Sequence, residues 1–178
     1  FAPSQPLQLN EEQQNALQTI TAAFDKQETK PIVLQGVTGS GKTEVYLQAA
    51  AHVLKQGKGV LILVPEISLT PQTMARFKSR FAESDTQVAI LHSAMSDGER
   101  FDEWRRIRHG QAKVVIGARS AVFAPCSNLG LIILDEEQEH SYKSENAPRY
   151  HAREVALWRG IKENALVLLG SATPSIES

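Results

Sequence analysis

The chain has 178 residues, a formal net charge of −1, 42% hydrophobic residues and 22% charged residues. These values indicate one globular domain with a sizeable core, and they exclude collagen-like, coiled-coil and disordered chains. No apolar run approaches the roughly 18 residues that a membrane span requires, so no membrane partner is expected. The balanced charge does not by itself point to nucleic acid, although it is compatible with a local basic surface.

The chain begins with FAPSQPLQLN, which has no starting Met and no targeting pattern. We therefore interpret it as a piece of a longer protein. Its single cysteine, Cys126, excludes an internal disulfide and a cysteine-based zinc site, and it fits a reducing cytoplasm.

Amphipathic stretches and short apolar runs alternate along the chain. The first stretch predicts a helix capped by Asn10, with apolar residues at helical spacing as far as Phe24. Further helices are expected at about residues 42–56, 71–81, 97–109 and 152–160. The apolar runs predict buried strands at residues 31–35, 59–66, 87–91, 112–117, 129–134 and 165–170. This pattern predicts an α/β fold with a mainly parallel sheet covered by helices on both faces, and ligands beyond the carboxyl ends of its strands.

The first predicted strand runs directly into GVTGSGKT, residues 36–43, which matches the phosphate-loop pattern G-x-x-x-x-G-K-[ST]. Backbone N–H groups of such a loop surround phosphate at the start of a helix, its lysine reaches the β and γ oxygens, and its hydroxyl residue holds Mg²⁺. A dinucleotide fingerprint is excluded because Glu44 stands where that motif needs glycine. The predicted ligands of ATP and Mg²⁺ are Gly36, Thr38, Gly39, Ser40, Gly41, Lys42 and Thr43.

The run ILDEE, residues 133–137, ends the fifth predicted strand. An aspartate at such a strand end holds Mg²⁺ in P-loop enzymes, usually through water, which makes Asp135 the candidate. Glu136 is then the candidate general base that polarises the attacking water. This second acid favours an NTPase that hydrolyses over a kinase, for which the chain shows neither a lid nor an acceptor site. The other interpretation is a solvated acidic turn.

Three more segments follow predicted strands: VPEISLT (residues 64–70), GARSAVFAP (117–125) and GSAT (170–173). The first two bring hydroxyls, backbone N–H groups and an arginine to one rim, where such groups suit phosphodiester contacts that do not read sequence. The third brings small hydroxyl residues that could relay between the acidic segment and a moving part. Taken singly, each segment is also consistent with a capped helix start, a surface arginine or an ordinary loop.

In this order, GSGKT, PEISLT, GARS, DEEQ and SAT resemble the motifs of the first motor domain of superfamily 2 helicases. Longer stretches, among them LNEEQ, LHSAMSDGER and DEEQEHSYKSENAPRYHAREVA, resemble the bacterial primosomal replication-restart helicases from about residue 9 to residue 178. The resemblance implies a RecA-like P-loop NTPase domain over residues 1–178, as the ATP-binding lobe of a longer multidomain protein. It further implies an ATP-dependent 3′→5′ DNA helicase of the bacterial cytoplasm that recognises stalled or branched forks and reloads the replication machinery. Alternatives are another superfamily 2 DNA translocase and a nucleotide-dependent DNA-binding module without unwinding.

The resemblance also implies roles by position. Gln13 would read the adenine edge, and Ser171 with Thr173 would couple hydrolysis to movement. The family's DNA-strand motifs fall on Pro65, Glu66, Thr70, Gly117, Arg119 and Ser120. Residues that would couple DNA binding to ATP hydrolysis are Gln138, Tyr142, Arg149, Tyr150, His151 and Arg153. Gln138 replaces the family's usual histidine and does not titrate near neutral pH, so the chemistry of this position differs here.

Helicases of this class close ATP between two motor domains, and the second domain supplies arginines to the γ-phosphate. The resemblance therefore implies a second motor domain, a zinc module outside this chain, forked DNA, primosome proteins and single-stranded DNA-binding protein as partners. For the isolated chain we expect weak nucleotide binding, with neither brisk ATP hydrolysis nor unwinding.

Overall fold

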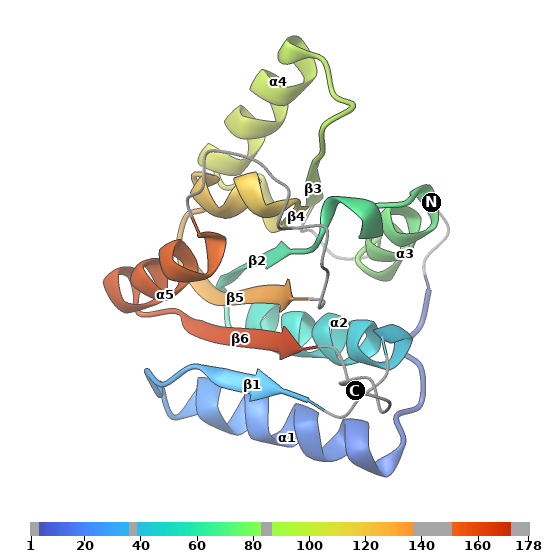
Figure 1. Cartoon of the computed structure of the whole chain (residues 1–178), viewed down its shortest axis with the longest axis vertical. Helices are drawn as coiled ribbons and strands as arrows, with labels where there is room; N and C mark the ends of the chain where they lie inside the picture. The colour runs from blue at the N-terminus through green and yellow to red at the C-terminus, as the bar shows by residue number, and fades with distance from the viewer. Residues whose placement is uncertain (1–3, 36–38, 83–86, 137–150, 172–178) are drawn as a thin grey trace.

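The computed structural model describes residues 4–35, 39–82, 87–136 and 151–171 of the chain. Within these residues the strands are β1 (Ile32–Leu34), β2 (Gly59–Leu63), β3 (Gln87–Leu91), β4 (Ala112–Gly117), β5 (Leu129–Glu136) and β6 (Leu166–Ser171). The helices are α1 (Glu11–Asp25), α2 (Gly39–Lys55), α3 (Pro71–Arg80), α4 (Asp97–Arg108) and α5 (Ala152–Glu163), with short 3-10 turns η1 (Glu66–Ser68) and η2 (Arg119–Phe123). Figure 1 shows these elements around one central sheet.

The sheet has six strands in the order β1-β6-β5-β2-β4-β3, and every neighbouring pair is parallel. The predicted parallel α/β fold is therefore confirmed. Strand β6 comes last along the chain but lies between β1 and β5, so that the carboxyl ends of these three strands are neighbours. Strands β2, β4 and β3 form the other half of the sheet.

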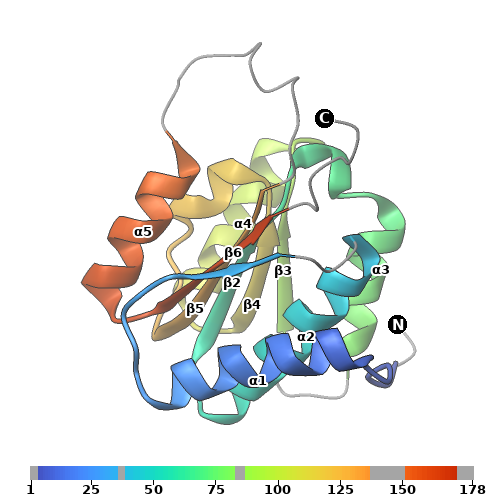
Figure 2. The same ribbon diagram turned by 60° about the horizontal axis from the view of Figure 1, so that its bottom comes forward.

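Two apolar layers cover the sheet, one on each face. One layer joins residues of α1, α2 and α3 to the sheet, including Ile20, Leu47 and Phe77. The opposite layer joins α4, α5 and η2 to it, including Ile107 and Ala156. Figure 2 shows the two groups of helices on opposite sides of the strands. Burial on both faces explains why β2 and most of β4 read as continuous apolar runs in the sequence.

Polar caps fix where three helices begin. The predicted cap Asn10 accepts a hydrogen bond from the Gln13 backbone N–H, while the Gln13 side chain accepts one from the Asn10 backbone, which completes a capping box. Ser96 and Glu99 form the same arrangement at α4. Thr70 caps α3 ahead of a proline in its first turn.

Several sequence-based boundaries or environments are wrong, including the end of α5, which lies at Glu163 and not near residue 160. Helix α2 begins at Gly39 rather than near residue 42, so the last glycines of the phosphate loop already belong to the helix. Strand β2 ends at Leu63, because the chain turns into η1. Strand β5 continues to Glu136, because both of its acidic residues pair with β6. Strand β1 is not fully buried: Val33 is 52% exposed, because β1 lies at the edge of the sheet.

Among the described residues, no helix is both long enough and apolar enough to cross a bilayer. Cys126 is a free thiol.

Candidate functional site

The strand register divides the predicted site residues into two groups along the carboxyl rim of the sheet. On one half, Gly170 of β6 pairs with Leu34 of β1 on one side and with Asp135 of β5 on the other. The phosphate-loop strand, the GSAT strand and the acidic strand therefore end side by side. On the other half, Leu63 of β2 pairs with Gly117 of β4, so that the PEISLT and GARS segments leave neighbouring strand ends.

A buried polar cluster formed by Lys42, Tyr46 and Asp135 lies on the first half of the rim. The Lys42 ammonium donates to Asp135 Oδ1 at 3.0 Å, and the Tyr46 hydroxyl donates to the same oxygen at 2.6 Å. Lys42 is 2% exposed and Asp135 is 8% exposed. The two donors lie four residues apart on α2, which places both on one face of the helix. The structure thus joins the lysine of the phosphate loop to the predicted metal-binding aspartate.

Glycine at position 170 makes room for this cluster. A Cβ atom on Gly170 would lie 1.8 Å from the Tyr46 hydroxyl and 3.0 Å from Asp135 Oδ1. Contacts below about 3.0 Å are not tolerated between real Cβ atoms and their neighbours, so any side chain at this position would displace the Tyr46 hydroxyl. The first residue of the GSAT segment is therefore glycine because the Tyr46 side chain of α2 leaves no space for a larger residue.

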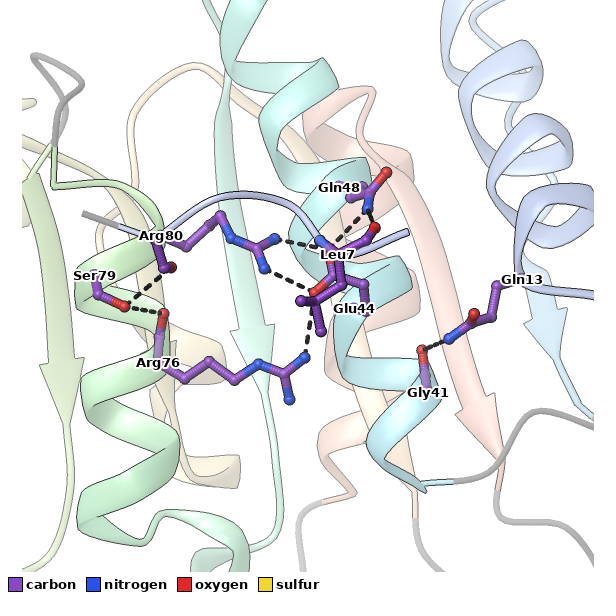
Figure 3. A network of polar contacts seen from close by, with 9 residues as sticks. Leu7, Gln13, Gly41, Glu44, Gln48, Arg76, Ser79 and Arg80 are labelled. Atoms are coloured by element: carbon purple, nitrogen blue, oxygen red, sulfur yellow. Dashed lines mark hydrogen bonds and ion pairs between the residues drawn. The ribbon is translucent and has the colours of Figure 1, made fainter. Parts of the chain in front are cut away.

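Gln13 connects α1 to the start of α2. Its side-chain amide donates to the Gly41 carbonyl at 3.1 Å, and its Oε1 accepts from the Asn10 N–H at 2.8 Å. Both ends of the amide are thus bonded within the chain, next to the phosphate-loop helix. Figure 3 shows Gln13 reaching Gly41.

The remaining nucleotide candidates are described in part. Thr43 is half-buried in α2, directly after Lys42, and Gly39 and Ser40 form the first residues of that helix. The Glu136 backbone ends β5 and pairs with Ser171, which ends β6. Gly36, Thr38 and Thr173 lie outside the described residues.

The PEISLT segment on the second half of the rim has mixed exposure. Pro65 is buried, whereas Glu66 is exposed and accepts hydrogen bonds from the Ser93 hydroxyl at 2.9 Å and from the Ser93 backbone at 3.4 Å. The Thr70 hydroxyl accepts from the Thr73 N–H at 3.1 Å as the cap of α3. Thr70 therefore has a structural role in addition to the predicted one.

The GARS segment begins at a position where the backbone is crowded. A Cβ on Gly117 would lie 2.7 Å from the Ala121 Cβ and 2.9 Å from the Leu91 carbonyl oxygen, so only glycine fits here. Arg119 is half-buried and Ser120 is exposed, both in the first turn of η2. The structure therefore places Ser120 at the surface, just after the strand end that pairs with the end of β2.

The predicted coupling residues lie mostly outside the described part. His151 is exposed and precedes α5, and Arg153 is exposed in the first turn of α5. Gln138, Tyr142, Arg149 and Tyr150 lie outside the described residues.

A second buried cluster, which sequence reasoning missed, surrounds Glu44 of α2. Arg80 of α3 donates to both carboxylate oxygens at 2.7 and 2.9 Å, and Arg76 donates at 3.2 Å. The Gln48 amide at 2.7 Å and the Leu7 N–H at 3.1 Å complete the set. Figure 3 shows both arginines reaching from α3 to Glu44 on α2. This cluster ties together the two helices that begin at the two halves of the rim.

The chemical environment keeps Glu44 ionised. Burial opposes the charge, but hydrogen bonds from Arg80, Gln48 and the Leu7 backbone, together with the charge of Arg80, outweigh it and hold the Glu44 pKa below its ordinary value. A lone acid followed by buried Val45, Tyr46 and Leu47 was the available sequence signal. That signal predicts a buried partner but does not identify which arginine provides it.

The oxygen atoms at and beside the first cluster suit a divalent cation that is bound together with phosphate. Asp135 supplies carboxylate oxygen and Thr43 supplies a hydroxyl, and hard cations such as Mg²⁺ prefer oxygen ligands and complete their shell with phosphate oxygens and water. No group of three or more His, Cys, Asp or Glu side chains that could hold a metal occurs within the described residues. The residues present therefore fit a metal held jointly by protein and nucleotide, not a protein-only metal site.

The parallel sheet, the phosphate loop after β1 and the buried pair of Lys42 and Asp135 define a RecA-like P-loop NTPase domain. The model of the "DEAD/DEAH box helicase" family matches residues 10–178. The chain belongs to this family, and nucleotide binding with a divalent metal follows from that membership.

Two similar relatives have the same protein name. "Replication restart protein PriA" of Bacillus subtilis (strain 168) is 54% identical over 100% of the chain, and that of Chlamydia pneumoniae is 48% identical over the same share. The chain spans only 22% and 24% of the length of these two relatives.

Among solved structures, the chain is similar to RecG in "Structure of RecG bound to three-way DNA junction". The TM-score is 0.70 and the sequence identity 29%, and the match covers 96% of this chain and 22% of that one. The agreement in fold extends over nearly the whole chain.

Proposed function

We propose that this chain is the ATP-binding lobe of a 3′→5′ DNA helicase that acts at stalled or branched replication forks and restarts replication by primosome assembly. The observation that carries this proposal is the buried pair of Lys42 and Asp135 at the meeting point of three strand ends. The similarity to replication restart proteins over the whole chain supports the biological setting. Polarity and preference for forks rest on the resemblance alone.

For nucleotide binding we assign the adenine edge to Gln13 and the γ-phosphate to Lys42. Gly36, Thr38, Gly39, Ser40 and Gly41 form the proposed phosphate cradle. Thr43 and Asp135 would hold Mg²⁺, which supplies charge neutralisation at the β- and γ-phosphates when it is bound.

The chain's own residues then act in a defined order. The phosphates attract the Lys42 ammonium away from Asp135, since a triphosphate carries more negative charge than one carboxylate. Asp135 would then be free to hold the metal together with Thr43. Glu136 accepts a proton of the attacking water as the water oxygen bonds to the γ-phosphorus and the bond to the leaving ADP oxygen breaks. Ser171, which pairs with Glu136, and Thr173 would pass the change at the γ-phosphate to the moving part.

For DNA we assign the second half of the rim. Pro65, Glu66, Thr70, Gly117, Arg119 and Ser120 are the proposed strand contacts. Because β2, β4 and β3 lie together on this side, nucleotide and DNA would occupy separate halves of one edge. The proposed coupling residues are Gln138, Tyr142, Arg149, Tyr150, His151 and Arg153.

The proposed partners are a second motor domain, which closes over ATP, forked DNA, primosome proteins and single-stranded DNA-binding protein, in the bacterial cytoplasm. Zinc is assigned to other parts of the longer protein.

A second candidate function is that of another DNA translocase of superfamily 2, which the 29% identity to the junction-bound RecG structure favours.

ATP turnover tests the proposal, measured with and without forked DNA on two proteins. One is the 178-residue chain, and the other is a chimera in which this chain replaces the matching part of the Bacillus subtilis relative. We expect slow turnover by these 178 residues alone, because helicases of this class take arginines for the γ-phosphate from a second motor domain. For the chimera we expect DNA-stimulated turnover and 3′→5′ unwinding of a fork.

Two results would overturn the proposal. Brisk DNA-stimulated hydrolysis by the chain alone would show that no second lobe is needed. A folded chimera that binds nucleotide but neither hydrolyses it nor unwinds a fork would contradict the assigned helicase activity. A chimera that translocates on duplex DNA without restarting replication in a reconstituted primosome would favour the second candidate.

A further inference from the structure

The phenol of Tyr46 lies against Asp135, the aspartate proposed to hold the metal. Its hydroxyl donates to Asp135 Oδ1 at 2.6 Å, a distance typical of strong hydrogen bonds to ionised carboxylates. Tyr46 as a whole is 2% exposed and belongs to the apolar layer that joins α1, α2 and α3 to the sheet. Apolar packing around the ring thus fixes where the hydroxyl can point.

The backbone on the opposite side is shaped to admit this hydroxyl. Gly170 pairs with Asp135 across the sheet, and a Cβ on Gly170 would come within 1.8 Å of the hydroxyl. The Tyr46 hydroxyl is the nearest of the atoms that a Cβ at this position would meet. Tyr46, Asp135 and Gly170 therefore form one fitted unit contributed by α2, β5 and β6.

An aspartate held by its backbone alone does not have a fixed carboxylate plane, because its last torsion is broad. Two donors on the same oxygen, Lys42 and Tyr46, fix that plane in the structure. Lys42 is also the residue that the phosphates are expected to attract. After that exchange, Tyr46 is the donor that remains on Asp135 from this cluster.

We propose that Tyr46 is a positioning residue that orients the Asp135 carboxylate for the divalent metal once Lys42 has turned to the nucleotide. This inference rests on the proposed function, because it assumes that Asp135 holds the metal. Tyr46 itself touches neither the nucleotide nor the metal in this account.

The test is the metal dependence of nucleotide binding in Tyr46→Phe, which removes the hydroxyl and keeps the ring. The affinity of a fluorescent ATP analogue for the chain is measured over a range of Mg²⁺ concentrations, and Mn²⁺ binding in the presence of ADP is measured by electron paramagnetic resonance. We expect the apparent metal affinity to fall about tenfold to a hundredfold, as is typical when a partner of a metal ligand is lost. Nucleotide binding without metal should stay unchanged.

The matched control is His52→Gln, which alters another hydrogen bond from α2 to a carboxylate, that of Asp25 at 2.8 Å. This control should leave metal dependence unchanged. A folded Tyr46→Phe protein with the metal affinity of the wild type would overturn the inference. If the wild-type chain shows no metal-dependent nucleotide binding at all, the proposed function fails instead, so that the two failures are distinguishable.

A second variant tests the fit at Gly170. Gly170→Ala should weaken metal binding in the wild-type background, because the new Cβ displaces the Tyr46 hydroxyl. In the Tyr46→Phe background the same change should have a clearly smaller effect, since there is no hydroxyl left to displace. Equal effects in both backgrounds would contradict the proposed link between Gly170 and Tyr46.

Discussion

Asp135 and Glu44 are two buried carboxylates near the start of α2, and each is paired with a cationic side chain. They differ in how fully their oxygens are occupied by hydrogen bonds. Within the part of the chain that the structure describes, Asp135 accepts hydrogen bonds from Lys42 and Tyr46, both at Oδ1. Glu44 accepts five, three at Oε2 and two at Oε1. A carboxylate offers about four lone-pair sites, so that Glu44 is saturated whereas Asp135 retains accepting capacity.

This difference in occupancy distinguishes the Asp135 cluster, which can bind a ligand, from the Glu44 cluster, which has a structural role. A site must contain groups that can exchange partners. Lys42 of α2 holds Asp135 through one contact to Oδ1, and a triphosphate, which carries more negative charge, can attract its ammonium. The Glu44 cluster has no such exchange available, since Arg80 holds both oxygens of Glu44, and Arg76, Gln48 and the Leu7 N–H occupy their remaining accepting capacity. We therefore interpret the Asp135 cluster as the part of the domain that changes with the nucleotide, and the Glu44 cluster as the part that fixes α2 against α3.

The largest effect is expected from Lys42→Ala. In the chimera, ATP turnover should fall by about a hundredfold to a thousandfold, because one preorganised charge at the phosphates is lost. Steady-state hydrolysis with forked DNA measures this, with Lys55→Ala at the other end of α2 as control. Fork binding should stay largely intact, and its loss in Lys42→Ala would argue against separate nucleotide and DNA regions.

Glu44→Ala should mainly lower the stability of the fold and should not act directly on ATP hydrolysis. The free energy of unfolding should fall by about 3–5 kcal/mol, because the variant leaves the buried Arg80 guanidinium without its carboxylate. Urea denaturation measures this change. The comparison variant is His52→Ala, whose partner Asp25 is half exposed, and there the expected cost is at most about 1 kcal/mol. Similar losses of unfolding free energy in the two variants would contradict the interpretation that Glu44 fixes α2 against α3.

The smallest effect concerns pH. The pKa of Glu44 is lowered in the folded state, so its contribution to stability is present above its ordinary value of 4.5 and is lost as the pH falls through the lower folded-state value. Glu44→Gln removes this titration. The difference in unfolding free energy between wild type and Glu44→Gln should be constant above pH 4.5 and should shrink in more acidic solution. A difference that grows in acid would mean that the pKa is raised instead.

Local patterns in the sequence were sufficient for the existence and order of the six strands and the five helices, because each depends on a few consecutive residues. They were insufficient for contacts between distant segments. Tyr46 and Asp135 are 89 positions apart, and Glu44 and Arg80 are 36 apart. The exposure of Val33 was missed for a related reason, since an apolar run does not tell an edge strand from a central one.

The residue roles at the nucleotide half stay predictions, as do those at the DNA half. What the structure adds is their spatial order: β6 brings Gly170 and Ser171 between the phosphate-loop strand and the acidic strand, although it is the last strand in the chain. No periodicity in the sequence encodes that insertion.

A structure of this chain with Mg²⁺ and a non-hydrolysable ATP analogue tests the central claim most directly. We predict that Lys42 Nζ leaves Asp135, from 3.0 Å to beyond hydrogen-bonding distance, and contacts the phosphates. The Arg80 contacts to Glu44, at 2.7 and 2.9 Å, should stay as they are. An analogue bound in the phosphate loop while Lys42 remains on Asp135, or a Glu44 cluster that opens on binding, would contradict the account.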